Sequence, residues 1–413
     1  MVYAKAMTDF SQKTIAIGIC GGIAAYKACD LIRELQRRDA TRVIPLMTAS
    51  AQQFITPLTL QSLSREEVIT SELKIESDGT PTHIKLAQQA DVLVIVPATV
   101  NTIAKLANGF ADDIISTTFM TFTNKPVVIA PAMNTRMWHH PIFEENLEKL
   151  ERLPNVSIVD PIAGNLACGE TGDGHLASQE IILAHIYKAM HAEKNLYANQ
   201  RAIVTAGGTR EAIDPVRVLT NKSSGKMGIA MADELWAMGA EVTLVTSVKN
   251  LEKPYAIIPV ESALEMQTAL ENRFDECDVL VMAAAVGDFT AAASPQKIKR
   301  QGKPRLQLEL TANPDIIGEL AKRKRENQIV IGFAAESENL LENAQEKLTR
   351  KNLDAIVAND ISRNDIGFDA DQNEITLLIR DEEPVVLPKA GKDQIAREVL
   401  MKLDSLNFST ARG

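Results

Sequence analysis

Short apolar segments alternate with longer amphipathic stretches through the first half of the chain. Four of these segments, at residues 14–20, 42–48, 91–96 and 125–130, are rich in Val and Ile, and stretches with helical spacing separate them. The first segment leads into Gly21-Gly22 and then into a predicted helix from about Ile23 to Arg38. Short β-branched strands separated by helices are typical of a parallel sheet with helices on both faces. The pattern therefore predicts a doubly wound α/β fold.

The same pattern begins again after a polar interval at residues 191–200. A predicted helix at about 178–190 precedes this interval, and an apolar strand at 201–206 follows it and leads into Gly207-Gly208-Thr209. A chain of 413 residues is also too long for one ordinary hydrophobic core. We therefore expect two doubly wound, Rossmann-like domains, at residues 1–195 and 196–413.

The composition argues against several classes of protein. The 44 Lys and Arg residues against 54 Asp and Glu residues give a net charge of −10, the wrong sign for a protein that must neutralise nucleic-acid phosphates. Residues 1–12 lack the apolar core of a secretory signal, and no apolar run reaches about 18 residues, the length that spans a membrane. We expect a cytoplasmic protein with no nucleic-acid or membrane partner.

The four cysteines are scattered without the spacing of a metal site or a disulfide framework. Cys20, Cys29 and Cys277 lie in apolar surroundings, where a free cysteine usually packs as a small core residue. Cys168 instead lies in a glycine-rich stretch at residues 164–175, which we expect to form a surface loop. Cys168 is therefore the cysteine with a candidate chemical role.

Neither half carries a familiar nucleotide-binding motif. The G-x-G-x-x-G sequence is absent, and the second strands end in Thr48 and in Thr246-Ser247 rather than in an acidic residue that would bind a ribose. Gly225-Lys226 is followed by Met227, so the hydroxyl of a Walker A motif is missing. Hydroxyl groups at these strand ends suit a phosphate better than a ribose. The sequence thus argues against an NAD enzyme and against a P-loop NTPase.

Three features of the first half lie at strand ends or in loops, where open α/β sheets bind ligands. The segment at residues 96–101 could cradle a phosphate at a helix start, or could simply cap that helix. Asn134, after the fourth strand, could bond a carboxylate or a flavin edge, or could serve as an N-cap. His83, taken alone, is more often a surface histidine than a catalytic base.

Five motifs of the first half resemble, in order, those of the flavin-containing cysteine decarboxylases. They are Gly21-Gly22-Ile-Ala-Ala-Tyr-Lys27, His83 and the segments at residues 97–105, 131–134 and 167–172. The resemblance implies a flavodoxin-like flavoprotein fold, with His83 as the active-site base, Asn134 bound to the substrate carboxylate and Cys168 as a proton donor on a flap. It also implies FMN as the cofactor, held by Gly22, Thr48, Ser50, Ala98, Thr99, Asn101 and Met133.

These residue types fit the decarboxylation of an acylated cysteine. An α-carboxylate beside a CH₂SH group has no electron sink, so CO₂ leaves only after the flavin has oxidised the thiol carbon to a thioaldehyde. When hydride returns, an acid must protonate the neighbouring carbon, and a loop cysteine can supply that proton. One position departs from the family, because His175 stands where arginine is expected. A contact from His175 to a substrate phosphate would be weaker, or would depend on pH.

The second half carries candidate anion sites of its own. The stretch at residues 219–228 combines serines, glycines and lysines before a predicted helix, and could form an anion-binding nest or a plain capped helix. Asp288 follows an apolar strand at residues 278–283 and could hold a metal ion or a ribose hydroxyl, and Lys297 could neutralise a triphosphate. The basic run at residues 322–325 is better explained as a solvated helix face than as a nucleic-acid site.

Segments of the second half resemble, again in order, the phosphopantothenate-cysteine ligase family over residues 201 to about 405. The resemblance implies a ligase fold that activates 4′-phosphopantothenate as an acyl-cytidylate, with CTP and Mg²⁺, and then joins it to L-cysteine. Asn221 matches the asparagine that handles the acyl intermediate, whereas Gly287 and Phe289 replace an expected Ala and Tyr. The positions implied for CTP binding are Met282, Ala283, Ala284, Asp288, Lys297, Pro314, Asp315, Ile316, Ile317, Phe333, Lys347 and Lys351.

Together the two resemblances indicate a bifunctional enzyme of coenzyme A synthesis, in which the ligase product is the substrate of the decarboxylase. A flavin-binding regulatory subunit without catalysis is the alternative, and the intact His83, Asn134, Cys168, Asn221 and Lys297 argue against it. A flavodoxin-like electron carrier would need no ligase half. The resemblance further implies a homo-oligomer, with trimers of the flavin half, dimers of the ligase half and a dodecamer in all, in which His83 meets the flavin across a subunit interface. The sequence does not identify metal ligands.

Overall fold

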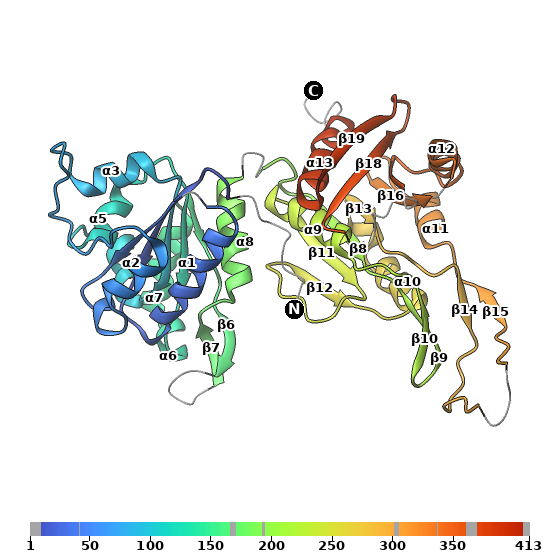
Figure 1. Ribbon diagram of the computed structural model, residues 1–413, viewed down its shortest axis with the longest axis horizontal. Coiled ribbons are helices and arrows are strands. Elements are labelled where there is room, and N and C mark those ends of the chain that lie inside the picture. The colour runs from blue at the N-terminus through green and yellow to red at the C-terminus, as the bar shows by residue number, and fades with distance from the viewer. Residues whose placement is uncertain are drawn as a thin grey trace. The chain divides into compact units, whose positions relative to one another are not determined.

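The structure is a computed structural model that describes residues 10–40, 42–165, 171–191, 195–300, 305–336, 338–360 and 370–407. The described residues form two compact units, the first from residue 10 to residue 191 and the second from residue 195 to residue 407. Each unit is an α/β unit with its own large sheet (Figure 1). In the described part of the chain, no helix is both long and apolar enough to cross a membrane.

A parallel sheet of five strands forms the centre of the first unit. The strand order β2-β1-β3-β4-β5 is that of flavodoxin-like folds, and it places a topological switch point between β1 and β3. The four strands predicted from the sequence are confirmed, and β5 is an additional strand of only three residues. The bounds are β1 Thr14–Ile19, β2 Arg42–Met47, β3 Val92–Ala98, β4 Val127–Pro131 and β5 Val156–Ile158.

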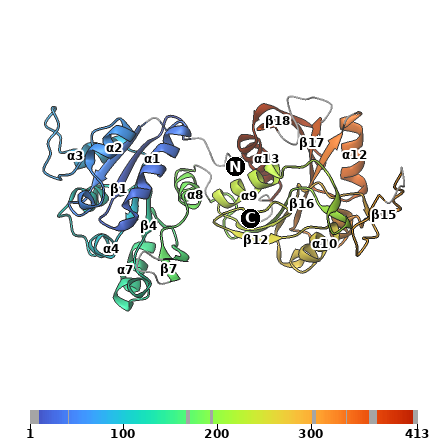
Figure 2. The same ribbon diagram turned by 60° about the horizontal axis from the view of Figure 1, so that its bottom comes forward.

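Helices lie on both sides of this sheet, as Figures 1 and 2 show. The first of them illustrates why: Ala28, Leu31, Ile32 and Leu35 of α1 recur at helical spacing and are all buried. The predicted helix from Ile23 begins as a 3-10 turn, η1, before the α-helix starts at Lys27. The bounds are η1 Ile23–Tyr26, α1 Lys27–Arg37, η2 Ala51–Gln53, α2 Pro57–Ser64, α3 Thr82–Gln89, α4 Val100–Ala107, α5 Ile114–Thr121, α6 Thr135–Trp138, α7 Pro141–Glu151 and α8 Gln179–Met190.

An antiparallel ribbon replaces part of the surface loop that we expected at residues 164–175. Its strands are β6, Ile162–Asn165, and β7, Thr171–His175. Gly174 has φ 109°, and a Cβ atom there would lie 2.5 Å from the carbonyl oxygen of Met133. Glycine therefore lets β7 pack directly on the segment after β4, which is why a glycine-rich stretch forms a strand here. Cys168 lies outside the described residues.

The second unit contains a sheet of eight strands in the order β12-β11-β8-β13-β16-β17-β18-β19. The strands from β12 to β17 are parallel, and their order is the 3-2-1-4-5-6 order of the Rossmann fold. The last two strands are antiparallel additions. The bounds are β8 Arg201–Ala206, β11 Glu241–Thr246, β12 Ala256–Pro259, β13 Val279–Met282, β16 Ile329–Glu336, β17 Ala355–Asp360, β18 Gln372–Ile379 and β19 Val385–Gly391.

Helices and two small ribbons complete the second unit (Figure 1). The ribbons are β9 with β10 and β14 with β15, and both extend from the body of the unit. The helix α9 follows the β9–β10 ribbon, and ten of its residues are buried, so it forms much of the core on that side. The bounds are β9 Arg210–Asp214, β10 Arg217–Thr220, α9 Lys226–Ala237, α10 Ala263–Glu271, η3 Phe274–Glu276, β14 Phe289–Ala291, β15 Leu310–Ala312, α11 Ile316–Lys322, α12 Leu340–Arg350 and α13 Lys392–Asn407.

Candidate active sites

A cavity of about 1140 Å³ opens at the carboxyl ends of β1, β2, β3 and β4 in the first unit. Parallel α/β sheets bind their ligands at this edge, beside the topological switch point. Volumes of this size accommodate cofactors and substrates. Seven of the residues expected at the flavin and substrate sites line the cavity: Gly22, Thr48, Ser50, Thr99, Asn101, Met133 and Asn134.

The turn after β1 lies very close to the turn after β2. A Cβ atom on Gly21 would lie 2.4 Å from Cβ of Ser50 and 2.7 Å from its carbonyl carbon, so only glycine fits. Thr99 forms the opposite wall and caps α4, because its side chain accepts a hydrogen bond from Thr102 N. The free N–H groups at the start of α4 and the hydroxyls of Thr48 and Ser50 are therefore available to an anionic group.

Thr99 and Asn134 both cap helices, which is one of the two roles considered for them from the sequence. Oδ1 of Asn134 accepts a hydrogen bond from Arg136 N at 2.9 Å and caps α6, while the residue also lines the cavity. The hydroxyl of Thr135 donates to the carbonyl of Asp173 at 2.6 Å, and Met133 N donates to the carbonyl of Gly174 at 3.0 Å. These bonds bring β7 to the wall of the cavity beside Asn134.

Two lysines line the cavity in different electrostatic settings. Nζ of Lys105 lies 2.8 Å from Asp112 and 2.9 Å from Asp113, so its charge is neutralised. Nζ of Lys27 lies 2.8 Å from Nε2 of His175, a neutral partner, and no carboxylate of a described residue lies within 4.0 Å of it. Burial lowers the pKa of Lys27, and burial together with the nearby Lys27 charge lowers the pKa of His175. Lys27 and His175 thus present a positive group that has no carboxylate of the described residues beside it.

Two of the expected residues do not line this cavity. His83 lies on α3, half-buried, and its Nδ1 is buried without a hydrogen-bond partner among the described residues. Ala98 is fully buried at the end of β3, behind the lining residues. The sequence reasoning quoted Lys27 and Lys105 only as parts of motifs, and it missed Asp112 and Asp113. The sequence signal that could have identified Asp112 and Asp113 was their position directly before the predicted start of a helix.

In the second unit, several expected residues meet at the carboxyl ends of β8 and β13. Ala284 N donates to the hydroxyl of Thr205 at 3.0 Å, directly after Met282 and Ala283. The amide of Asn221 donates to the carbonyl oxygens of Ala285 and Val286 at 3.3 and 3.2 Å. Asn221 is thereby fixed against the segment that leads to Asp288. Sequence reasoning missed Thr205 as the residue that ties these segments together.

Asp288 is joined to the segment before α11. Asn313 N donates to the carbonyl of Asp288 at 2.9 Å, and the Asn313 amide donates to the carbonyl of Gly287 at 2.8 Å. Pro314 follows, and Asp315 caps α11 by accepting a hydrogen bond from Gly318 N at 3.2 Å, while Ile316 and Ile317 begin the helix and are buried. The loop expected to bind CTP therefore lies beside Asp288.

Lys347 of α12 and Lys351, the C-cap residue of that helix, complete this cluster. Nζ of Lys351 lies 2.7 Å from Oδ1 of Asp315, and Nζ of Lys347 donates to the carbonyl of Phe333 on β16 at 2.8 Å. Although burial opposes it, the Lys351 ammonium lowers the pKa of Asp315. No hydrogen bond or ion pair between described residues joins Lys297 to this cluster. Lys297 lies on the segment after β14, which is bonded to the β9–β10 ribbon.

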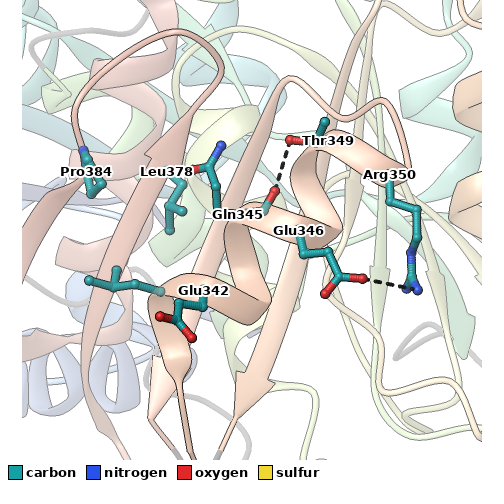
Figure 3. Close-up of a pocket in the computed structure, with 8 residues that line it drawn as sticks. Glu342, Gln345, Glu346, Thr349, Arg350, Leu378 and Pro384 are labelled. Atoms are coloured by element: carbon teal, nitrogen blue, oxygen red, sulfur yellow. Dashed lines mark hydrogen bonds and ion pairs between the residues drawn. The ribbon is translucent and has the colours of Figure 1, made fainter.

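The outer face of α12 borders a different, open groove of about 710 Å³, shown in Figure 3. It is lined by Leu341, Glu342, Gln345, Glu346, Thr349, Arg350, Leu378 and Pro384. Arg350 lies 3.7 Å from Glu346, and the hydroxyl of Thr349 donates to the carbonyl of Gln345 (Figure 3). No residue expected to bind CTP lines this groove.

The folds define a protein of two α/β units. The first has the strand order of flavodoxin-like folds and a cavity at its strand ends, and the second has the strand order of the Rossmann fold and a cluster of lysines and carboxylates at its strand ends. The family model called Flavoprotein matches residues 4–191, and the DNA/pantothenate metabolism flavoprotein C-terminal domain matches residues 197–406. The chain is 40% identical over 405 residues to the coenzyme A biosynthesis bifunctional protein CoaBC of Bacillus subtilis (strain 168), covering 97% of this chain and 98% of that protein.

The protein of the same name from Escherichia coli (strain K12) is 38% identical over 408 residues, which covers 97% of this chain and 99% of that protein. A crystal structure of the C-terminal domain of such a protein is 37% identical, with a TM-score of 0.44, and covers 51% of this chain and 97% of its own. The chain belongs to this family of bifunctional coenzyme A biosynthesis proteins. It is a phosphopantothenoylcysteine decarboxylase joined to a phosphopantothenate-cysteine ligase.

Proposed function

We propose that the cavity of the first unit binds FMN, and that 4′-phosphopantothenoylcysteine is decarboxylated there to 4′-phosphopantetheine. The observation that carries this proposal is the convergence of seven expected residues, from four strand ends, on one cavity. FMN would supply the oxidation of the thiol carbon and the later return of hydride. Gly22, Thr48, Ser50 and Thr99, with the N–H groups of α4, would hold its phosphate.

The substrate would bind in the same cavity, beside β7. The amide of Asn134 would hold the substrate carboxylate, because it lines the cavity at the end of β4. Lys27 and His175 would face a second anionic group of the substrate, its phosphate, since Lys105 is already neutralised by two carboxylates. Cys168, outside the described residues, would donate the final proton. Asn101 and Met133 would contact the flavin, and Ala98 would support it from behind.

For the second unit, we propose that CTP is the nucleotide that activates 4′-phosphopantothenate, before L-cysteine displaces CMP. The support is the cluster at the strand ends, where Asp288, Asp315, Lys351 and the Phe333–Lys347 pair come from separate segments. Lys347, Lys351 and Lys297 would neutralise phosphate groups of the nucleotide, and Met282, Ala283 and Ala284 would offer backbone groups to the base. Asn221, fixed beside residues 285–286, would orient the acyl intermediate.

Mg²⁺ would enter with the triphosphate. Among the described residues, no group of three or more His, Cys, Asp or Glu side chains is arranged to hold a metal ion. Mg²⁺ in nucleotide sites commonly keeps several waters and takes its other ligands from phosphates and from one or two carboxylates. Asp288 is the carboxylate that we assign to this role.

The protein is proposed to act in the cytoplasm as a homo-oligomer, with trimers of the flavin half and dimers of the ligase half that together form a dodecamer. Exposed apolar side chains support such contacts, among them Ile23, Phe54 and Leu58 in the first unit and Val216 and Phe289 in the second. The location of His83 outside the cavity of its own chain is consistent with its use by a neighbouring copy. Light scattering of the purified protein should give twelve copies of the 45.1 kDa chain.

One coupled assay tests both activities. The purified protein should be yellow with bound FMN, and 4′-phosphopantothenate, cysteine, CTP and Mg²⁺ together should yield 4′-phosphopantetheine. Pyrophosphate should form with CTP but only slowly with ATP. A colourless protein that takes up no FMN would refute the flavin proposal, and equal turnover with ATP would refute the choice of nucleotide.

A further inference from the structure

The segment that carries Lys297 is attached to the β9–β10 ribbon on both sides of that lysine. Before it, Ser294 N donates to the carbonyl of Ile213 at 2.9 Å. After it, Ile298 N donates to Oδ2 of Asp214 at 3.1 Å, and the guanidinium of Arg217 donates to the carbonyl of Ile298. Lys297 itself is exposed, whereas Ile298 is half-buried against the ribbon. The ribbon therefore fixes the backbone around Lys297 and leaves the ammonium group outward.

Asp214 is the centre of this attachment. Its side chain is fully buried, and it accepts hydrogen bonds from Val216 N at 2.9 Å, from Nε of Arg217 at 3.0 Å, from Nη2 of Arg217 and from Ile298 N. Burial would raise the pKa of this carboxyl, but the hydrogen bonds from Val216, Arg217 and Ile298 outweigh it and hold the pKa at about 2. The carboxylate is thus charged at every working pH.

A buried carboxylate of this kind needs all of its donors. Removing both carboxylate oxygens would leave Arg217 and the N–H of Ile298 without their acceptor, and removing the charge alone would weaken these bonds; unpaired or weakened buried groups are costly. Two of the three donor residues, Val216 and Arg217, belong to the ribbon, and their hydrogen bonds to Asp214 are enough to stabilise its turn. The bond to Ile298 reaches 84 positions along the chain, into the Lys297 segment. That bond does not stabilise the ribbon itself; it attaches the Lys297 segment to the ribbon.

We propose that Asp214, assisted by Arg217, is a positioning residue of the ligase reaction, which holds the Lys297 segment so that the Lys297 ammonium meets the nucleotide triphosphate. This proposal rests on the role of Lys297 in nucleotide binding given above. Asp214 does not touch the nucleotide. It restricts the backbone at residues 294–298, so that the segment loses little conformational entropy when the triphosphate binds.

The test uses the full-length enzyme with Asp214→Asn, which keeps the size of the side chain but removes its charge and half of its acceptors. The KM for CTP should rise about tenfold, the effect of one lost charged contact, with a smaller change in kcat. Hydrogen exchange at residues 294–299 should become faster. Decarboxylase activity, which belongs to the other unit, should stay unchanged and serves to normalise the enzyme concentration, while the melting temperature reports on the ligase unit.

A matched control is Asp233→Asn. Asp233 is buried, as Asp214 is, and it likewise pairs with a basic side chain, Nζ of Lys253 at 2.7 Å. It lies on α9, however, and has no contact with the Lys297 segment. This variant should lower the melting temperature without a change in the KM for CTP or in exchange at residues 294–299. If both variants raise the KM equally, the effect of Asp214→Asn is general destabilisation and the proposal is wrong.

The remaining variants separate this proposal from the one on which it rests. In Lys297→Gln, a normal KM for CTP would refute the role of Lys297, and with it the catalytic purpose of Asp214. Unchanged exchange at residues 294–299 in Asp214→Asn would refute the positioning role alone. The double variant should be no worse than Lys297→Gln, and additive effects would show that Asp214 acts by another route. If Asp214→Asn fails to fold, Arg217→Gln, whose side chain is 43% exposed, should give the same changes to a smaller degree.

Discussion

Nζ of Lys27 lies 2.8 Å from Nε2 of His175, although the two residues are 148 positions apart in the sequence. The ammonium donates in this bond, so Nε2 must be unprotonated, and the lowered pKa of His175 agrees with that. Both residues line the cavity of the flavin half. The pair therefore carries one positive charge, on Lys27, hydrogen-bonded to a neutral imidazole, and this charge can bind an anion.

The first prediction concerns His175. Its pKa lies below the ordinary 6.5, so the fraction that is protonated grows as the pH falls from 8 towards 5. A protonated His175 adds a second positive charge beside Lys27, and the KM for 4′-phosphopantothenoylcysteine should fall with it. His175→Arg should lower the KM at pH 8 severalfold and flatten its dependence on pH, because arginine is always charged. Steady-state kinetics of both proteins across this range check it.

Lys27→Gln provides the companion measurement, with a KM raised about tenfold or more by the lost charge. Flavin content should be unchanged, because Lys27 is assigned to the substrate and not to FMN. Equal pH slopes in the wild type and in His175→Arg would show that the slope comes from the substrate phosphate alone.

The second prediction concerns the turn after β1. Gly21→Ala should destabilise the protein, by about 1–3 kcal/mol, because the added Cβ would lie 2.4 Å from Cβ of Ser50 and the two turns would have to separate. Gly22→Ala is the control, since the nearest atom to its Cβ lies 3.8 Å away and its backbone is extended. Chemical denaturation without added flavin measures both. An equal loss of stability in the two variants would contradict the prediction.

The third prediction separates two neighbouring basic residues at the C-terminal end of α12, its last residue Arg350 and its C-cap Lys351. Lys351→Gln should raise the KM for CTP about tenfold, because this lysine meets Asp315 at the proposed nucleotide site. The neighbouring Arg350→Gln should have no such effect, since Arg350 is exposed and pairs with Glu346 beside the open groove (Figure 3). Pyrophosphate release at varied CTP compares them. A similar rise in both variants would mean that the total positive charge of α12, and not the site, attracts the nucleotide.

The sequence predicted the fold class well, because β-branched strands such as residues 92–96 carry their pattern locally. The small ribbons were not predicted, since strands such as β7 and β14 are short, and glycines or polar residues interrupt their alternation. Resemblance identified Lys351 and Asp315 as members of one site, and the structure brings them within 2.7 Å. The pairing of Lys27 with His175 could not be predicted, because it depends on how β7 packs against residues 133–135.

The fourth prediction concerns acid stability of the flavin half. His185 on α8 faces Ser157, and burial together with the charge of Lys188 lowers its pKa from 6.5 to about 4. Between pH 4 and pH 6.5, His185 binds a proton in the unfolded chain but not in the folded chain. The free energy of unfolding therefore falls as the pH falls from 6.5 towards 4. The slope from this residue approaches ~1.4 kcal/mol per pH unit. Lys188, with a pKa of about 8, is protonated throughout this window and contributes no slope.

His185→Gln removes the titration and keeps a polar side chain beside Ser157. Its stability should therefore decline less between pH 6.5 and pH 5 than that of the wild type, by about 1.5 kcal/mol. Urea denaturation at the two pH values, followed by the release of bound flavin, gives both numbers. If the two proteins lose the same free energy of unfolding over this interval, His185 is already protonated in the folded state, and acid sensitivity must come from carboxylates elsewhere in the domain.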